Sequence, residues 1–225
     1  YNNINYKKTM LLSLVPLFFI ILISGRRAAW IMLALTSFSF FIYGFIFYEN
    51  KRFFLKIVSI TIIFISIIFG TVISSHQPLK TRIIATQGLF SNNYGSFNVA
   101  TAYRLPIWET AYDIFKKNVV FGIGPRGFRH VYENYAKPDD IFVKENVPPT
   151  QPHLLLLEIM CETGLVGLMG YFFALFFLFK FVLQQKTKKH LLPYFIPVAV
   201  AMFPLNAHMA FYGSIWASMI WLLTS

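Results

Sequence analysis

The chain has 225 residues, of which 56% are hydrophobic and 13% are charged. Soluble domains carry about a quarter of their residues as charged ones, so the composition excludes an ordinary soluble fold and indicates an integral membrane protein. The net charge of +11 would favour a nucleic-acid partner in a soluble protein. In a membrane protein, however, the positions of basic residues mainly reflect the orientation of the spans, so we expect no nucleic-acid partner.

Five apolar stretches are long enough to cross a bilayer as helices. They are residues 9–25, 28–48, 53–74, 154–183 and 191–225. The last stretch contains Pro193, Pro197 and Pro204, which interrupt helical hydrogen bonding, so we interpret it as two crossings. The sequence therefore predicts an all-α polytopic membrane protein with about six transmembrane helices. Because the chain lacks an initiator methionine and stops in an apolar run, we expect it to be a piece of a longer protein.

Basic residues in the short loops predict the orientation of these spans. They lie before the first span, between the second and third, and after the fourth: Lys7, Lys8, Lys51, Arg52, Lys56, Lys186, Lys188 and Lys189. The positive-inside rule assigns this side to the cytoplasm, which places the long polar loop on the periplasmic face. We expect three transmembrane helices in 1–74, a periplasmic loop in 75–152, and a long transmembrane helix with two further spans in 153–225.

The polar loop contains a predicted amphipathic helix at 106–118. Its apolar residues recur at helical spacing: Ile107, Ala111, Ile114 and Phe115. Pro106 suits the first turn, and Asp113 and Lys117 have the four-residue spacing of an ion pair. Such a helix can lie on the membrane surface.

A glycine-rich turn follows this helix. Three glycines have the G-x-G-x-x-G spacing: Gly122, Gly124 and Gly127. A nucleotide site is disfavoured because the run follows a helix rather than a strand and contains Pro125. Either the turn projects Arg126 and Arg129 near the membrane surface, or these arginines are simply solvated.

Three further arginines border the loop or the spans. Arg26 and Arg27 lie between the first two spans, on the side that the positive-inside rule disfavours. They either snorkel to lipid headgroups or bind the phosphate oxygens of a substrate, for which guanidinium groups are well shaped. Arg104 precedes the amphipathic helix and is either a solvated loop residue or a partner in the same site. No metal-binding motif is present, so we expect arginine rather than a metal or cofactor to neutralise a leaving phosphate.

His153 precedes the long apolar helix predicted at 154–183. Thr150 can cap this helix and Pro152 can start it, and the helix dipole would favour a neutral imidazole that accepts a proton. The alternative is a histidine at the water boundary without a role. As one helix the stretch would measure on the order of 45 Å, so its first turns, with Glu158 and Glu162, should protrude; these acids have either a structural or a site role. Three glycines later in the helix indicate close helix packing: Gly164, Gly167 and Gly170.

Several segments, in order and spacing, resemble the superfamily of O-antigen ligases and polymerases. They read SGRRAAW at 24–30, RLPIW at 104–108, FGIGPRGF at 121–128, PHLLLLE at 152–158 and ETGLVG at 162–167. The resemblance implies a GT-C-like membrane fold in the bacterial inner membrane, with a periplasmic active site. It also implies a metal-independent, inverting transfer of O-antigen from undecaprenyl pyrophosphate to a lipid A-core hydroxyl, the ligase branch being favoured. The alternatives are an O-antigen polymerase and, in another class, a polysaccharide transporter or flippase subunit.

The same resemblance implies roles for individual residues. His153 would take or orient the proton of the acceptor hydroxyl, while Arg27 and Arg104 would stabilise the departing pyrophosphate. The remaining candidates would bind substrate, with the indole covering the sugar: Arg26, Trp108 and Arg126. Leu154 stands where many members have an asparagine, so a hydrogen bond made by that asparagine is not expected here.

Overall fold

The computed structural model describes residues 20–21, 27–75, 77–184 and 192–206. These residues form helices and turns and include no strand, which confirms an all-α fold. Three helices in the described part are long and apolar enough to cross a membrane: Ala28–Phe47, Lys51–Ser75 and Leu155–Phe181. Most of the predicted span 9–25 and everything after residue 206 lie outside the described residues, so the number of six spans stays a prediction.

Contacts divide the chain into two compact units, Tyr1–Gln87 and Gly88–Ser225. In the first unit, α2 (Arg27–Phe47) and α3 (Lys51–Ser75) are joined by a short turn. Asn50 caps α3, because its side-chain oxygen accepts from the N–H of Phe53 at 3.0 Å. The amino group of Lys51 donates to carbonyls of the last turn of α2, where a cation also complements the helix dipole.

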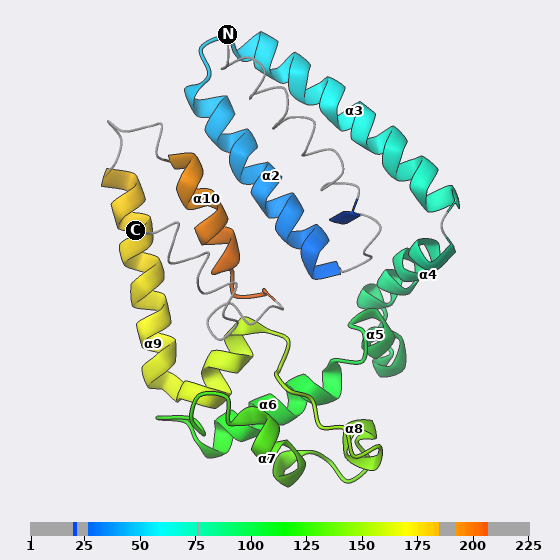
Figure 1. Cartoon of the computed structure of the whole chain (residues 1–225), viewed down its shortest axis with the longest axis vertical. Coiled ribbons are helices and arrows are strands. Elements are labelled where there is room, and N and C mark those ends of the chain that lie inside the picture. Colours follow the sequence, from blue (N-terminus) through cyan, green and yellow to red (C-terminus); the bar gives the residue numbers. More distant parts are fainter. Residues whose placement is uncertain (1–19, 22–26, 76, 185–191, 207–225) are drawn as a thin grey trace. The chain divides into compact units, whose positions relative to one another are not determined.

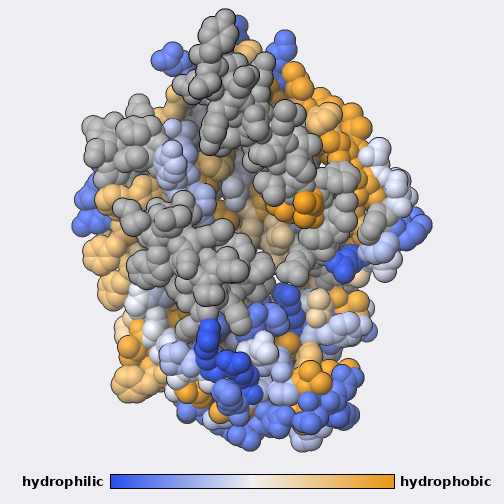
Figure 2. Space-filling view, in the orientation of Figure 1, coloured by the Kyte–Doolittle hydropathy of each residue, from blue (hydrophilic) through white to orange (hydrophobic). Residues whose placement is uncertain are grey.

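The α2–α3 hairpin is held together by rings and leaves its other faces exposed. The rings of Phe41 and Phe54 stack at 5.8 Å, and those of Trp30 and Phe69 meet edge to face at 6.3 Å. No residue of α3 is buried, although its sequence is strongly apolar. Figure 2 shows this as hydrophobic surface over α3. Such surface is stable only against lipid or further membrane helices.

The polar segment between α3 and the next long helix is itself mostly helical (Figure 1). It holds α4 (Gln77–Thr86), η1 (Gln87–Phe90), α5 (Tyr94–Ala100), α6 (Leu105–Lys117), α7 (Phe128–Tyr135) and α8 (Ile141–Lys144). The predicted amphipathic helix is confirmed in α6, and Pro106 occupies its first turn as expected.

The apolar face of α6 forms the core of the second unit. Ile107, Ala111 and Ile114 are buried against Phe128 and Tyr132 of α7. Cys161 of the following long helix, α9 (Leu155–Gln184), completes the cluster. Protein already covers this apolar face of α6. The face therefore does not lie against the membrane surface, and the expectation that it does is wrong.

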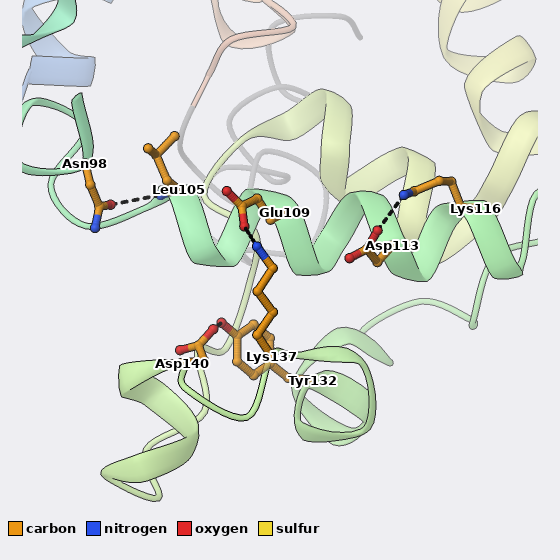
Figure 3. A network of polar contacts seen from close by, with 8 residues as sticks. All are labelled: Asn98, Leu105, Glu109, Asp113, Lys116, Tyr132, Lys137 and Asp140. Carbon is orange, nitrogen blue, oxygen red and sulfur yellow. Dashed lines mark hydrogen bonds and ion pairs between the residues drawn. The ribbon is translucent and has the colours of Figure 1, made fainter. Parts of the chain in front are cut away.

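Polar contacts fasten the outer side of α6 (Figure 3). The carboxylate of Glu109 pairs with Lys137 at 2.6 Å. Asp113 pairs with Lys116 at 2.6 Å, so the predicted pairing with Lys117, one residue further on, is wrong. Lys117 instead lies over the ring of Tyr135, 4.9 Å from its centre.

A second polar contact ties α7 to the start of α8 (Figure 3). The phenol of buried Tyr132 donates to the carboxylate of Asp140 at 2.8 Å. The same carboxylate accepts from the N–H of Phe142 at 2.8 Å and so caps α8. Burial, together with this hydrogen bond, raises the pKa of the Tyr132 phenol above its ordinary value, so the phenol stays protonated as a donor.

The long helix α9 (Leu155–Gln184) is broken at Gly164, whose backbone is left-handed at φ 64° and ψ −157°. Figure 1 shows α9 changing direction between its yellow-green start and its yellow remainder. Leu155 and Ile159, before the break, are buried, whereas most of the large apolar side chains after it, such as Leu165, are exposed; Tyr171 is a buried exception. The roughly 20 residues of 165–184 measure about 30 Å as a helix, which matches the hydrocarbon core. The expectation of one unbroken helix is wrong.

The last described helix, α10 (Leu192–Ala201), contains Pro197. A turn at 202–206 follows it and contains Pro204, one of the prolines that interrupt this apolar stretch. This turn packs back on α9, because the carbonyls of Asn206 and Pro204 accept from the N–H groups of Leu155 and Leu156 at 2.8 and 3.1 Å.

Candidate functional site

The break in α9 is filled by the glycine-rich turn that follows α6. Breaking a helix frees N–H and carbonyl groups that need new partners. Four backbone hydrogen bonds between residues 119–124 and 161–166, here called the bridge, provide them: Ile123 N–H to Cys161 O (3.0 Å), Gly124 N–H to Glu162 O (2.9 Å), Leu165 N–H to Val119 O (2.8 Å) and Val166 N–H to Val120 O (3.2 Å). Two motifs far apart in the sequence therefore form one structure.

Two glycines make this close approach possible. Gly122 and Gly164 both have positive φ, 65° and 64°, which residues with a Cβ adopt at a cost. A Cβ on Gly122 would lie 2.5 Å from the backbone nitrogen of Thr163, and one on Gly164 would lie 2.5 Å from the carbonyl carbon of Val120. Gly164 was predicted to permit close packing between helices, and it instead permits close contact with a loop. Among the described residues, no atom outside the local helix backbone lies within 4 Å of an added Cβ on Gly170.

Glu162 supports the turn that carries Arg126. Its side chain is buried, and one carboxylate oxygen accepts from the N–H of Arg126 at 2.8 Å, while the other lies 3.5 Å from the N–H of Phe128. Arg126 is exposed and its backbone is left-handed at φ 61°. A carboxylate that accepts from two backbone N–H groups of one turn stabilises such a strained turn. The structure therefore gives Glu162 a structural role.

Replacing Glu162 with glutamine is expected to loosen this turn. The amide keeps one acceptor but turns its NH2 group toward a backbone donor, which should cost about 1–3 kcal/mol. Trypsin cleavage at the Arg126–Gly127 bond should then become roughly tenfold to a hundredfold faster, because cleavage tracks local opening. Cleavage after Lys80, in α4, is the internal control and should not change. Equal cleavage of Arg126 in both proteins would contradict the role of Glu162.

His153 lies two residues before α9, which starts at Leu155, and also has a left-handed backbone, at φ 55°. Its Nδ1 lies 3.1 Å from the amide nitrogen of Gln151. The amide oxygen of Gln151 is buried and has no hydrogen-bond partner among the described residues. The first N–H groups of α9 are capped by the 202–206 turn, so the predicted capping by Thr150 and start at Pro152 are wrong.

The segments that carry Arg104 and His153 meet at Trp108. Arg104 is the N-cap residue of α6, and its carbonyl accepts from the N–H of Trp108 at 2.9 Å. The indole N–H of Trp108 donates to the carbonyl of Pro152, which precedes His153, at 3.0 Å. One tryptophan thereby connects the first turn of α6 to the histidine segment.

Left-handed backbone concentrates near the candidate residues. Five non-glycine residues in the described part have positive φ: Ala102, Tyr103, Arg126, Asn146 and His153. Two of them directly precede Arg104, and two are themselves candidates. Such conformations cost on the order of 1 kcal/mol each and are enriched at functional sites.

The arginine pair near the start of α2 is described only in part. Arg27 is the first residue of α2, in the other unit, and its side chain and all of Arg26 lie outside the described residues. Their approach to His153 therefore stays a prediction. In the described part no group of three or more histidine, cysteine or acidic residues could hold a metal ion.

The family of proteins described as O-antigen ligase matches residues 12–172, which is more than half of the 225 residues. The chain belongs to the O-antigen ligase family. No curated protein and no solved structure matches it. The O-antigen ligase match includes Arg27, Arg104, Arg126 and His153, and it extends into α9 beyond the break at Gly164.

One supporting residue and one supporting contact of this O-antigen ligase family protein were not indicated by sequence reasoning. Gln151 contacts His153 from only two positions away, and a polar residue beside a candidate histidine is a signal that could have been used. The contact between Glu162 and Arg126 joins residues far apart in the chain. Nothing in either local sequence indicates it.

Proposed function

We propose that the protein is a glycosyltransferase that moves O-antigen polysaccharide from undecaprenyl pyrophosphate to a hydroxyl of lipid A-core. It would act in the bacterial inner membrane, with its site on the periplasmic face. The family supports an activity of this general type. The observation that carries the proposal is the Trp108 connection, because it joins the segments bearing Arg104 and His153.

In the proposed reaction, the acceptor oxygen attacks the anomeric carbon while the bond to the pyrophosphate oxygen breaks. The configuration inverts, the hydroxyl proton passes to His153, and the bond electrons leave with the pyrophosphate. Arg104 and Arg27 stabilise its negative charge as it departs. Arg26 and Arg126 bind the carrier phosphates, and Trp108 covers the sugar.

Gln151 decides which nitrogen of the imidazole carries the proton. When its amide nitrogen donates to Nδ1, a neutral ring carries its proton on Nε2 and can only orient the hydroxyl. When the amide is turned, its oxygen accepts from Nδ1–H, and Nε2 is left as the base. The two orientations place nearly identical atoms at the same distance, so the chemistry selects between them.

Replacing Gln151 with glutamate is expected to preserve transfer and to change its pH dependence. A carboxylate can only accept from Nδ1–H, so Nε2 remains the base. The negative charge favours the imidazolium, so the acid limb of the pH–rate profile should move to higher pH. Replacing Gln151 with leucine, the matched control, should lower the rate without this displacement. If the glutamate variant had the lower rate at every pH, the base role of His153 through Nε2 would be wrong.

The proposed function can be tested with the purified full-length protein in liposomes. Carrier-linked O-antigen and lipid A-core are supplied, with and without a chelator, and products are separated on gels. We expect lipid A-core to gain the polysaccharide at the same rate in both cases. Extension of the carrier-linked chain without transfer to lipid A-core would identify a polymerase instead.

The family match leaves the polymerase branch as the second candidate. Both branches use the same carrier, so the proposed roles of Arg104 and His153 are shared. A deletion strain separates them. Loss of a ligase leaves lipid A-core bare with carrier-linked polymer accumulating, whereas loss of a polymerase leaves lipid A-core bearing one repeat unit.

A further inference from the structure

The turn after α6 exposes three consecutive apolar residues. Val119, Val120 and Phe121 are 39%, 53% and 74% exposed. Scattered exposed apolar residues need no explanation, but a contiguous group marks a contact surface. This group is distinct from the apolar face of α6, which is buried in the core.

The bridge fixes where these residues lie along α9. The carbonyls of Val119 and Val120 accept from the N–H groups of Leu165 and Val166, the first two residues of the part long enough to cross the bilayer. Leu165 and Val166 are also exposed, at 41% and 47%. In Figure 1 the turn lies beside the bend of α9. One apolar surface therefore continues from the turn onto the lipid-facing side of the helix.

The flanking residues are of the kinds found at a membrane interface. Lys116 and Lys117 immediately precede the turn, and their amino groups lie over the rings of Tyr112 and Tyr135, 4.8 and 4.9 Å from the ring centres. Tyrosines are enriched at the headgroup level, and lysines there keep their stems in apolar surroundings and their charges near phosphate.

We propose that residues 119–121 are a membrane anchor that inserts among the acyl chains of the leaflet at the Leu165 end of α9. The partner is the phospholipid bilayer, with Lys116 and Lys117 at its headgroup phosphates. The anchor holds the following turn, including Arg126, at the height of the membrane surface. This inference rests on the apolar half of α9 crossing the membrane and is independent of the proposed transfer chemistry.

Spin-label depth measurements test the anchor directly. A single cysteine replaces Phe121 in a protein whose buried Cys161 is changed to alanine, and the nitroxide-labelled full-length protein is placed in phosphatidylcholine–phosphatidylglycerol liposomes. Oxygen concentrates in the acyl region and a water-soluble nickel chelate is excluded from it. We expect the label at 121 to collide with oxygen severalfold more than with the chelate. A label replacing the exposed Glu133 of α7 should show the opposite preference.

Two results would overturn the proposal. Preferred collision with the nickel chelate at position 121 would place the turn in water. Low collision with both reagents would mean that protein, either another part of the full-length chain or a second copy, covers it. If gel filtration shows that the label at 121 disturbs folding, a label replacing Val120 gives the same measurement with the same expected outcome.

Discussion

Replacing His153 with asparagine is expected to lower the rate of glycan transfer about 10²- to 10⁴-fold, the usual contribution of a general base. Asparagine is the appropriate substitution because the backbone at this position is left-handed, and asparagine tolerates that conformation better than alanine does. Membrane insertion and thermal stability should therefore be nearly unchanged. The measurement is the initial rate of lipid A-core modification in liposomes, together with the melting temperature of each purified protein.

The matched control for this prediction is His130 replaced with asparagine. His130 is exposed on α7, and its loss should leave the rate within about twofold of the original. A His153→Gly protein supplies a second check, because glycine accepts the backbone conformation and leaves space for added imidazole, which should restore part of the rate. A His153→Asn protein with full activity would remove His153 from the mechanism.

Replacing Gly164 with alanine is expected to destabilise the protein by roughly 3–5 kcal/mol. The backbone of Gly164, at φ 64° and ψ −157°, lies in a region that is essentially confined to glycine, and it costs an alanine about 1–3 kcal/mol. Its Cβ would also lie 2.7 Å from the backbone nitrogen of Gly122, so the loop must move away and weaken the bridge, at about 1 kcal/mol for each hydrogen bond lost. Thermal unfolding in detergent, followed by the loss of monodisperse protein, measures the effect.

Gly170, in the same helix, provides the control. In the part of the chain that the structure describes, an added Cβ there would meet no neighbouring atom within 4 Å. The backbone of Gly170 is helical, so alanine should be neutral or stabilise by up to about 1 kcal/mol. Gly122→Ala should resemble Gly164→Ala, since the two glycines face the same bridge. A Gly164→Ala protein as stable as the Gly170→Ala protein would show that the bridge contributes little to stability.

The sequence predicts the regular parts of this fold well, because their signals are local. The apolar runs indicated α2, α3 and the length of α9, and the helical spacing of Ile107, Ala111 and Ile114 indicated α6. The break in α9 was not predicted. A glycine inside an apolar helix gives the same sequence pattern whether it permits close packing or interrupts the helical hydrogen bonds. The partner that decides between them is the backbone of a distant loop.

In the candidate site, too, the local signals were predicted from the sequence and the long-range contacts were not. Motif order identified Arg104, Arg126 and His153 as candidates, and the structure places the first and last on segments joined by Trp108. The contact of Glu162 with Arg126 joins a side chain to a backbone N–H 36 residues away, which no local spacing indicates. The contact of Gln151 with His153 joins two side chains and is local. Packing that completes a left-handed turn becomes visible only once the chain is folded.

The bridge also bears on how the protein is made. Chain synthesis releases residues 119–124 before residues 161–166, so the loop is already outside the ribosome when Gly164 emerges. A helix break left open at the edge of the hydrocarbon region would leave backbone groups without partners, at up to several kcal/mol each. The loop 119–124 can supply their hydrogen-bond partners as the span 165–184 enters the bilayer. Because this loop precedes residues 161–166 in the chain, the order of the two segments suits insertion during translation.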